Sequence, residues 1–125
     1  MIRGIGVDIV EIKRIAQLME KHGQRFLNRC FTQDEQSYCL KYEDPYPYLA
    51  VRYAAKEAVA KALGTGIGEL LSWTDIEVTK RPSGEPGIKL SDKAAEIFGD
   101  LTIYLSVSHE KAYAIAQVVI ETSTL

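Results

Sequence analysis

The stretch that spans residues 52–66, RYAAKEAVAKALGTG, constrains the fold of this chain more than any other. From Val51 onward, apolar residues recur at i, i+3, i+4, i+7, i+8, i+11 and i+12, the pattern of a helix with one buried stripe. The stripe consists mostly of alanine, whose small side chain lets another backbone approach closely. The pattern therefore predicts a central helix, ended by Gly64, that packs tightly against a sheet.

Charged residues border this stripe on both sides. At about 100° per residue, Glu57 and Lys61 lie together on one flank, and Arg52 and Lys56 lie on the other. Glu57 and Lys61 also have the spacing of an ordinary solvated helix pair, and that alternative stays open at this point. The glycine-rich run at residues 64–68 keeps bare backbone beside the Lys61 end of the helix.

Length and composition indicate one small domain spanning residues 1–125. The chain has 46% hydrophobic residues, enough for a modest core. A net charge of −2 and a pI near 5.7 argue against a protein that coats nucleic acid or an anionic membrane. No apolar run approaches the ~18 residues of a membrane span, and the first residues lack a signal-peptide layout.

Cys30 and Cys39 have neither metal-site nor disulfide spacing. We therefore expect reduced thiols in a cytoplasmic protein.

Residues 2–10, IRGIGVDIV, alternate as a strand that places Gly4, Gly6 and Asp8 on one face. Glycines within a strand often mark the close approach of a ligand or of another backbone. We expect them to clear space beside the Asp8 carboxylate. Asp8 followed by Glu11 also imitates a capping box, so Asp8 as the N-cap of the next helix is an equally open alternative.

Residues 12–22 predict an amphipathic helix closed by Gly23, with a basic outer face. Between residues 11 and 29, five basic residues stand against two acidic ones, a local excess of three positive charges in an acidic protein. A solvated face is one explanation. The patch also suits an acidic protein partner, with Arg14 as the expected anchor among Lys13, Arg14, Lys21, Arg25 and Arg29.

The remaining segments predict two short helices and two hairpins. Thr32 with Glu35 forms a capping box for a helix to about residue 41, and EDPYP at residues 43–47 predicts a loop. Ser91 is placed to cap a helix that ends before Gly99. The expected hairpins pair residues 75–80 with 88–90, and residues 101–108 with 113–121.

The second hairpin carries Ser108 and His109 at its tip, where both side chains are free to meet a ligand. A histidine in a tight turn is also commonly a plain surface residue.

Two carboxylates from separate elements, Asp8 and Glu57, suit Mg²⁺, which keeps several waters and takes phosphate oxygens from a substrate. Lys61, the glycine run and the hairpin tip then have the chemistry to hold phosphates. Phosphoryl transfer needs positioning and charge neutralisation rather than a protein nucleophile, and none is evident.

Three stretches carry a resemblance to a known family. GIGVDIVEI at residues 4–12, RYAAKEAVAKALGTG at 52–66, and SVSH at 106–109 with AQVVIE at 116–121 resemble the short bacterial holo-[acyl-carrier-protein] synthases of the 4'-phosphopantetheinyl transferase superfamily. The resemblance implies an α+β fold in which antiparallel hairpins pack against a long central helix. It also implies transfer of 4'-phosphopantetheine from coenzyme A to a serine of apo acyl carrier protein. The implied reaction releases adenosine 3',5'-bisphosphate with Mg²⁺ bound and supports fatty acid biosynthesis.

The same resemblance implies roles for single residues. Asp8 and Glu57 are the implied Mg²⁺ ligands, and Lys61 contacts the pyrophosphate and stabilises the leaving phosphate. The implied coenzyme A contacts are Arg52, Lys56, Lys61, Gly64, Gly66, Pro86, Ser108 and His109. The implied assembly is a homotrimer with sites between protomers, and the carrier protein docks on the basic face. Two positions depart from the family pattern: Tyr53 replaces a more usual Phe, and Glu85 replaces a Lys in the turn at residues 83–86.

Two other classes of protein use the same residues. A regulatory nucleotide-binding module would need the phosphate cradle but no serine-bearing partner. A Mg²⁺-dependent phosphohydrolase would use water as the acceptor.

Overall fold

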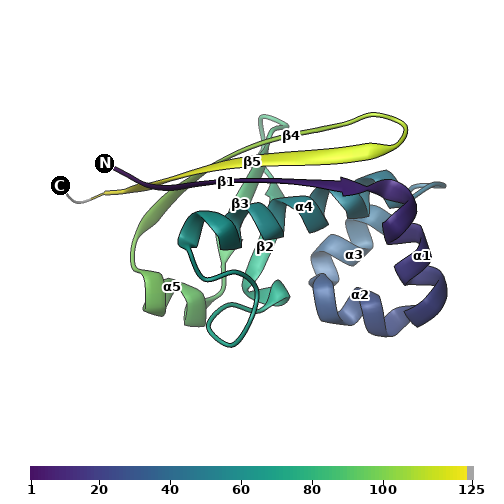
Figure 1. Cartoon of the computed structure of the whole chain (residues 1–125), viewed down its shortest axis with the longest axis horizontal. Coiled ribbons are helices and arrows are strands. Elements are labelled where there is room, and N and C mark those ends of the chain that lie inside the picture. The colour runs from purple at the N-terminus through teal and green to yellow at the C-terminus, as the bar shows by residue number, and fades with distance from the viewer. Residues whose placement is uncertain (124–125) are drawn as a thin grey trace.

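The computed structural model describes residues 1–123 and has an α+β architecture. A three-stranded antiparallel sheet of order β1-β5-β4 lies over the long helix α4, and a two-stranded sheet, β2-β3, packs against α4 through β2 and against β4 through β3 (Figure 1). Helices α1 to α3 gather at one end and α5 at the other. The elements are β1 (Ile2–Glu11), α1 (Ile12–His22), α2 (Gln24–Cys30), α3 (Gln33–Leu40), α4 (Tyr46–Leu63), η1 (Trp73–Asp75), β2 (Ile76–Lys80), β3 (Pro86–Leu90), α5 (Asp92–Phe98), β4 (Leu101–His109) and β5 (Tyr113–Thr122).

Most local predictions are confirmed. The Thr32 capping box is complete, because Thr32 Oγ1 accepts from the Glu35 amide and Glu35 Oε1 accepts from the Thr32 amide. Ser91 caps α5 by accepting from the Ala94 amide at 3.1 Å. Both expected hairpins form, β2 with β3 and β4 with β5. Within residues 1–123, no helix has the length and apolar composition that a membrane span requires.

Two segments differ from the prediction. Helix α2 was not expected, and it starts immediately after Gly23, whose φ of 56° ends α1 and redirects the chain. Helix α4 begins at Tyr46, inside the stretch expected to be a loop. Pro47 lies in the first turn of α4, where a missing N–H breaks no intrahelical hydrogen bond, so the proline starts the helix rather than ending it.

The alanine stripe of α4 is buried against β1, as its composition predicts. A Cβ added to Gly4 would lie 2.0 Å from the Ala62 carbonyl oxygen, and one added to Gly6 would lie 2.0 Å from that of Ala58. The strand and helix backbones are therefore in direct contact. The expectation that these glycines clear space beside Asp8 is wrong, because α4 itself fills that space.

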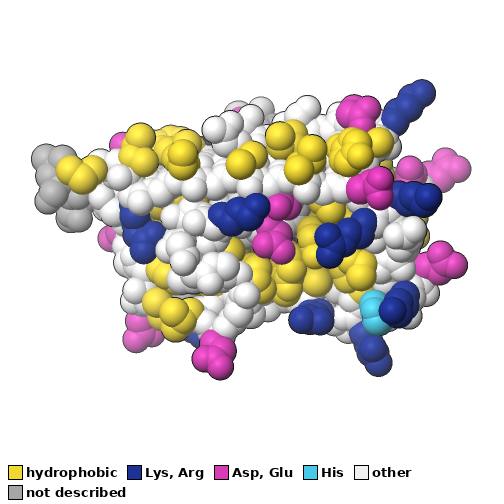
Figure 2. All heavy atoms as spheres, viewed as in Figure 1, with side chains coloured by type: hydrophobic (Ala, Val, Ile, Leu, Met, Phe, Trp, Pro, Cys, Tyr) yellow, Lys and Arg dark blue, Asp and Glu magenta, His cyan; other side chains and the backbone are white. Residues whose placement is uncertain are grey.

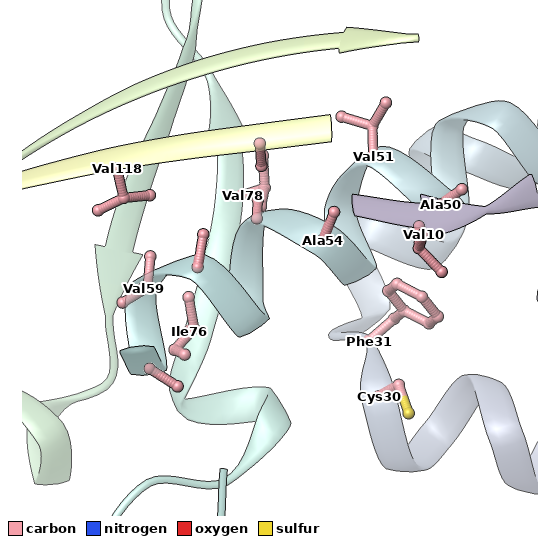
Figure 3. Close-up of a cluster of buried hydrophobic side chains, with 14 of the residues drawn as sticks. Val10, Cys30, Phe31, Ala50, Val51, Ala54, Val59, Ile76, Val78 and Val118 are labelled. Carbon is pink, nitrogen blue, oxygen red and sulfur yellow. The ribbon is translucent and has the colours of Figure 1, made fainter. Parts of the chain in front are cut away.

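The core extends from this contact toward the small sheet and the helical end. Figure 3 shows Val118 of β5 and Val78 and Ile76 of β2 gathered around α4. Phe31, which follows α2, lies near Val10 of β1 and is almost fully buried. Cys30 and Cys39 are free and buried, and burial raises the pKa of each thiol to about 11, which keeps both protonated and unreactive.

The close approach predicts that Gly6→Ala will destabilise the protein. The new methyl group meets backbone, which cannot rotate away, so we expect the free energy of unfolding to fall by roughly 2–3 kcal/mol. Gly68→Ala is the matched control, because a Cβ there meets nothing within 4 Å, and it should change stability by less than about 0.5 kcal/mol. Urea denaturation measures both, and equal small effects would contradict the close packing.

Candidate functional site

Asp8 lies in the middle of β1 and does not cap a helix. It pairs with Ala116 of β5, and the N-cap of α1 is Glu11, which makes no side-chain capping bond. The N-cap alternative for Asp8 is therefore wrong. Ala116 is fully buried beneath the sheet, and because paired residues share a face, the Asp8 side chain lies on the face covered by α4.

Lys61 reaches Asp8 from the last turn of α4. Its Nζ donates to Asp8 Oδ1 at 3.2 Å and to the Val7 carbonyl at 3.0 Å, and the side chain is 53% exposed. Among the described residues, the carboxylate that pairs with Lys61 is Asp8 rather than Glu57. Glu57 and Lys61 therefore do not form the ordinary helix ion pair that the sequence left open.

Glu57 lies half-buried on α4, one turn before Lys61. Burial raises the pKa of its carboxyl group, and the Asp8 charge raises it further, whereas Lys61 and Arg14 oppose the shift. The two carboxylates therefore interact electrostatically, and a cation shared between them would relieve the repulsion. Two carboxylates leave several coordination positions to water and substrate oxygens, a donor set that fits Mg²⁺.

A basic and aromatic surface borders the carboxylates. Arg14 of α1 is exposed and acts on the Glu57 charge. Beyond it lies a pocket of about 260 Å³ between α1, α2 and α4, lined by Leu18, His22, Arg25, Phe26, Arg29, Cys30, Tyr53 and Trp73. Figure 2 shows basic side chains on both sides of an acidic group below the sheet, and more basic side chains with a histidine toward the α1–α2 end.

The structure brings Arg52, Pro86 and His109 together in a second pocket of about 200 Å³. The Arg52 guanidinium lies 4.3 Å from the centre of the Tyr38 ring and donates to the Tyr48 carbonyl at 3.2 Å. Its Nε is buried and has no hydrogen-bond partner among residues 1–123. A buried guanidinium with an unsatisfied donor, lying in a concave site, can bind an anion through that donor.

Aromatic residues of this second pocket were missed in the sequence analysis. Tyr42 and Tyr48 stack at 3.8 Å between ring centroids, and the His109 ring lies 6.3 Å from that of Tyr48. The available signal was the density of tyrosines at residues 38–48, at positions 38, 42, 46 and 48. Lys80 of β2 also lines the pocket, so its wall is cationic as well as aromatic.

The two hairpin-tip residues point to opposite faces of the sheet. His109 pairs with buried Ala114, whereas Ser108 pairs with exposed Ile115. Gly64 and Gly66 form the exposed turn after α4, with φ of 83° and 66°. This turn lies next to Lys61, as expected, because the Gly64 amide donates to the Lys61 carbonyl at 3.0 Å.

Lys56 occupies a different place from the one expected. Its side chain is fully buried, its Nζ lies 2.5 Å from Glu35 Oε1, and it donates to the Trp73 carbonyl at 3.1 Å. Glu35 also accepts from the Val78 amide at 2.9 Å. Burial lowers the pKa of the Lys56 ammonium, and Glu35 opposes that shift. Lys56 therefore ties α4 to α3, η1 and β2, and its ammonium is not exposed to a coenzyme A molecule on the surface.

Comparison with known proteins decides the family. Residues 4–118 match the family model described as ACPS, the 4'-phosphopantetheinyl transferase superfamily. The chain belongs to the 4'-phosphopantetheinyl transferase superfamily. The resemblance inferred from the sequence is confirmed, and so is the fold class.

Relatives within the superfamily have the same length and shape. The chain is 49% identical to the holo-[acyl-carrier-protein] synthase of Chlamydia felis over 115 residues, which cover 92% of this chain and 93% of that protein. The Neisseria meningitidis synthase structure matches with a TM-score of 0.90 at 40% identity, covering 98% of this chain and all of the other. The Helicobacter pylori synthase, solved in complex with coenzyme A, matches with a TM-score of 0.86 at 38% identity, covering 94% and 99%.

Proposed function

We propose that this protein transfers 4'-phosphopantetheine from coenzyme A to a serine of an apo acyl carrier protein and releases adenosine 3',5'-bisphosphate. The observation that carries the proposal is the convergence of Asp8, Glu57 and Lys61 from β1 and α4, directly beside a basic and aromatic surface. The names of the relatives, and the coenzyme A complex of one of them, support the substrate and the partner. This activity supplies the carrier protein for fatty acid biosynthesis, in the cytoplasm.

Asp8 and Glu57 would hold Mg²⁺, and Lys61 would contact the pyrophosphate. The metal ion supplies positive charge at the phosphate under attack. Burial raises the pKa of Glu57 and the Asp8 charge raises it further, and this repulsion between the two carboxylates supports a cation between them. Lys61 is exposed and, among residues 1–123, bonds only to Asp8 and one carbonyl, so its ammonium can turn toward the leaving phosphate.

The pocket of Arg52, Pro86 and His109 suits the nucleotide end of coenzyme A. The unpaired Arg52 Nε and the nearby Lys80 provide charge for a phosphate, and the tyrosines provide a surface for a base. Gly64 and Gly66 offer backbone beside Lys61. Ser108, on the opposite sheet face from His109, would contact coenzyme A only where another chain meets that face.

The outer sheet face supports a homotrimer with sites between protomers. It exposes a row of apolar side chains, among them Ile5 at 67%, Val7 at 52% and Ile9 at 62%. Figure 2 shows this row along the strands. Contiguous exposed apolar area of this kind usually marks an interface, and a small chain gains core by covering it.

The basic face of α1 and α2 suits an acidic carrier protein. Lys13, Arg14, Lys21 and Arg25 are all exposed. Arg14 acts on the Glu57 charge, and Arg25 lines the pocket that contains Leu18, Phe26 and Trp73. An acidic surface with one projecting apolar side chain would match both the charge and the pocket.

One assay separates this function from the two alternative classes. Coenzyme A, Mg²⁺ and apo carrier protein are mixed with the protein, and intact-mass analysis follows the carrier. A carrier that gains one phosphopantetheinyl group supports the proposal. Hydrolysed coenzyme A with an unmodified carrier indicates a phosphohydrolase, and unchanged coenzyme A indicates a regulatory module.

The first variants to test in that assay are Asp8→Asn and Glu57→Gln. Each removes one carboxylate charge, so transfer should fall by at least about 100-fold, the usual cost of losing one group that stabilises transition-state charge. Thermal denaturation serves as the folding control, because both side chains lie at the edge of the core. Near-normal transfer by either variant at limiting Mg²⁺ would refute the metal assignment.

Mixing two inactive variants tests the sites between protomers. Glu57→Gln and His109→Ala chains, refolded together, should recover about a quarter of the wild-type sites, because each site would take Glu57 from one protomer and His109 from its neighbour. The matched control mixes Asp8→Asn with Glu57→Gln, which come from the same protomer and should not rescue each other. No rescue in confirmed mixed trimers would place the whole site in one chain.

Reversing the charge of Arg14 tests carrier docking. Arg14→Glu should raise the KM for carrier protein roughly ten-fold and weaken its salt dependence, because exposed charges are screened beyond about 8 Å. Coenzyme A binding should stay unchanged. Lys93→Glu, on α5 at the opposite end of the molecule (Figure 1), is the matched control. An equal loss of coenzyme A affinity in Arg14→Glu would move this residue to the nucleotide site.

A further inference from the structure

The Tyr53 hydroxyl has no assigned task in the fold. The ring is well packed, with its centroid 4.6 Å from that of Trp73 and 6.4 Å from that of Phe26. Phenylalanine would fill the same space. No residue within the described range 1–123 hydrogen-bonds the hydroxyl, although the side chain is only partly exposed.

This hydroxyl lies between the carboxylate pair and the basic pocket. Tyr53 precedes Glu57 by one turn of α4, so both residues project from the same side of that helix. It also lines the pocket that contains Arg25 and Arg29. Burial raises the pKa of the phenol, Arg14 lowers it, and Glu57 and Asp8 raise it, so both carboxylates are close enough to act on the hydroxyl. The raised pKa keeps the phenol protonated, and hence a hydrogen-bond donor, at neutral pH.

An acceptor serine has to occupy the same region. Under the proposed function, the phosphate under attack is bound at Asp8 and Glu57, and the body of the carrier protein rests on the basic face. The segment that bears the serine must bridge these two sites, and Tyr53 lies on the way between them. Docking would also remove water from the Tyr53 hydroxyl, which then loses its hydrogen bond unless the carrier supplies an acceptor.

We propose that the Tyr53 hydroxyl donates a hydrogen bond to a carbonyl oxygen flanking the acceptor serine of the carrier protein. Tyr53 is then a positioning residue, which holds the serine hydroxyl toward the phosphate without taking part in the chemistry. This inference rests on the proposed function and adds a contact specific to the protein substrate. Coenzyme A does not need the contact.

Tyr53→Phe tests the inference, because it keeps the ring and removes only the hydroxyl. Loss of one neutral hydrogen bond should lower kcat/KM for the apo carrier by about 2- to 10-fold. The Kd for coenzyme A and the thermal midpoint should not change. Tyr46→Phe is the matched control, since Tyr46 is partly buried in the first turn of the same helix, and it should leave all three quantities unchanged.

Salt dependence separates this contact from simple charge attraction. The ratio of wild-type to Tyr53→Phe kcat/KM should stay constant as salt rises, because a neutral hydrogen bond is not screened, whereas the corresponding ratio for Arg14→Glu should shrink. An unchanged kcat/KM in Tyr53→Phe would overturn the inference, and so would a loss confined to coenzyme A affinity or to stability. A wild-type protein that transfers nothing would overturn the proposed function and this inference together, so the two failures are distinguishable.

Discussion

The direct contact between the backbones of β1 and α4 is the constraint on which the rest of the structure depends. Gly4 and Gly6 have no side chain because the carbonyls of Ala62 and Ala58 occupy that space. Asp8 follows Gly6 on the same face of the strand, and Lys61 precedes Ala62 on the helix. The 3.2 Å pair between Lys61 and Asp8 therefore follows from the packing of small residues several ångströms away. In this fold, the core determines the distance between the charged groups.

Much of this arrangement could be predicted from the sequence, because its signals are local or periodic. The alanine stripe, the alternation of β1 and the capping residues Thr32 and Ser91 each follow from short-range rules, and all are confirmed. The family motifs also single out Asp8, Glu57 and Lys61, three residues that the fold brings near one another. Helix α2 was missed, since seven residues are too few for a helical period to stand out.

What could not be predicted depends on tertiary partners. A helical wheel places Lys56 beside the stripe, but burial of its ammonium requires Glu35, 21 residues earlier, at 2.5 Å. Removing two charges from water is costly, and this pair is stable only because Thr32, Trp73 and Val78 satisfy the remaining hydrogen-bonding capacity. Ser108 and His109 likewise point to opposite faces because both belong to β4 and pair with β5. The sequence pattern predicts this strand only to residue 108, so it does not predict the direction of His109.

Because β1 is an edge strand of its sheet, Lys61 has a second role, which is to cover a backbone carbonyl of that edge. An edge strand presents unpaired carbonyls to which another chain can add a strand, and natural proteins often block such edges with lysine. Here the Lys61 ammonium covers the Val7 carbonyl at 3.0 Å. Under the proposed function that ammonium turns toward a phosphate, and the Val7 carbonyl would then return to water and leave the edge strand unprotected. In that proposal, protection of the β1 edge against strand addition and engagement of the substrate would compete for one cation.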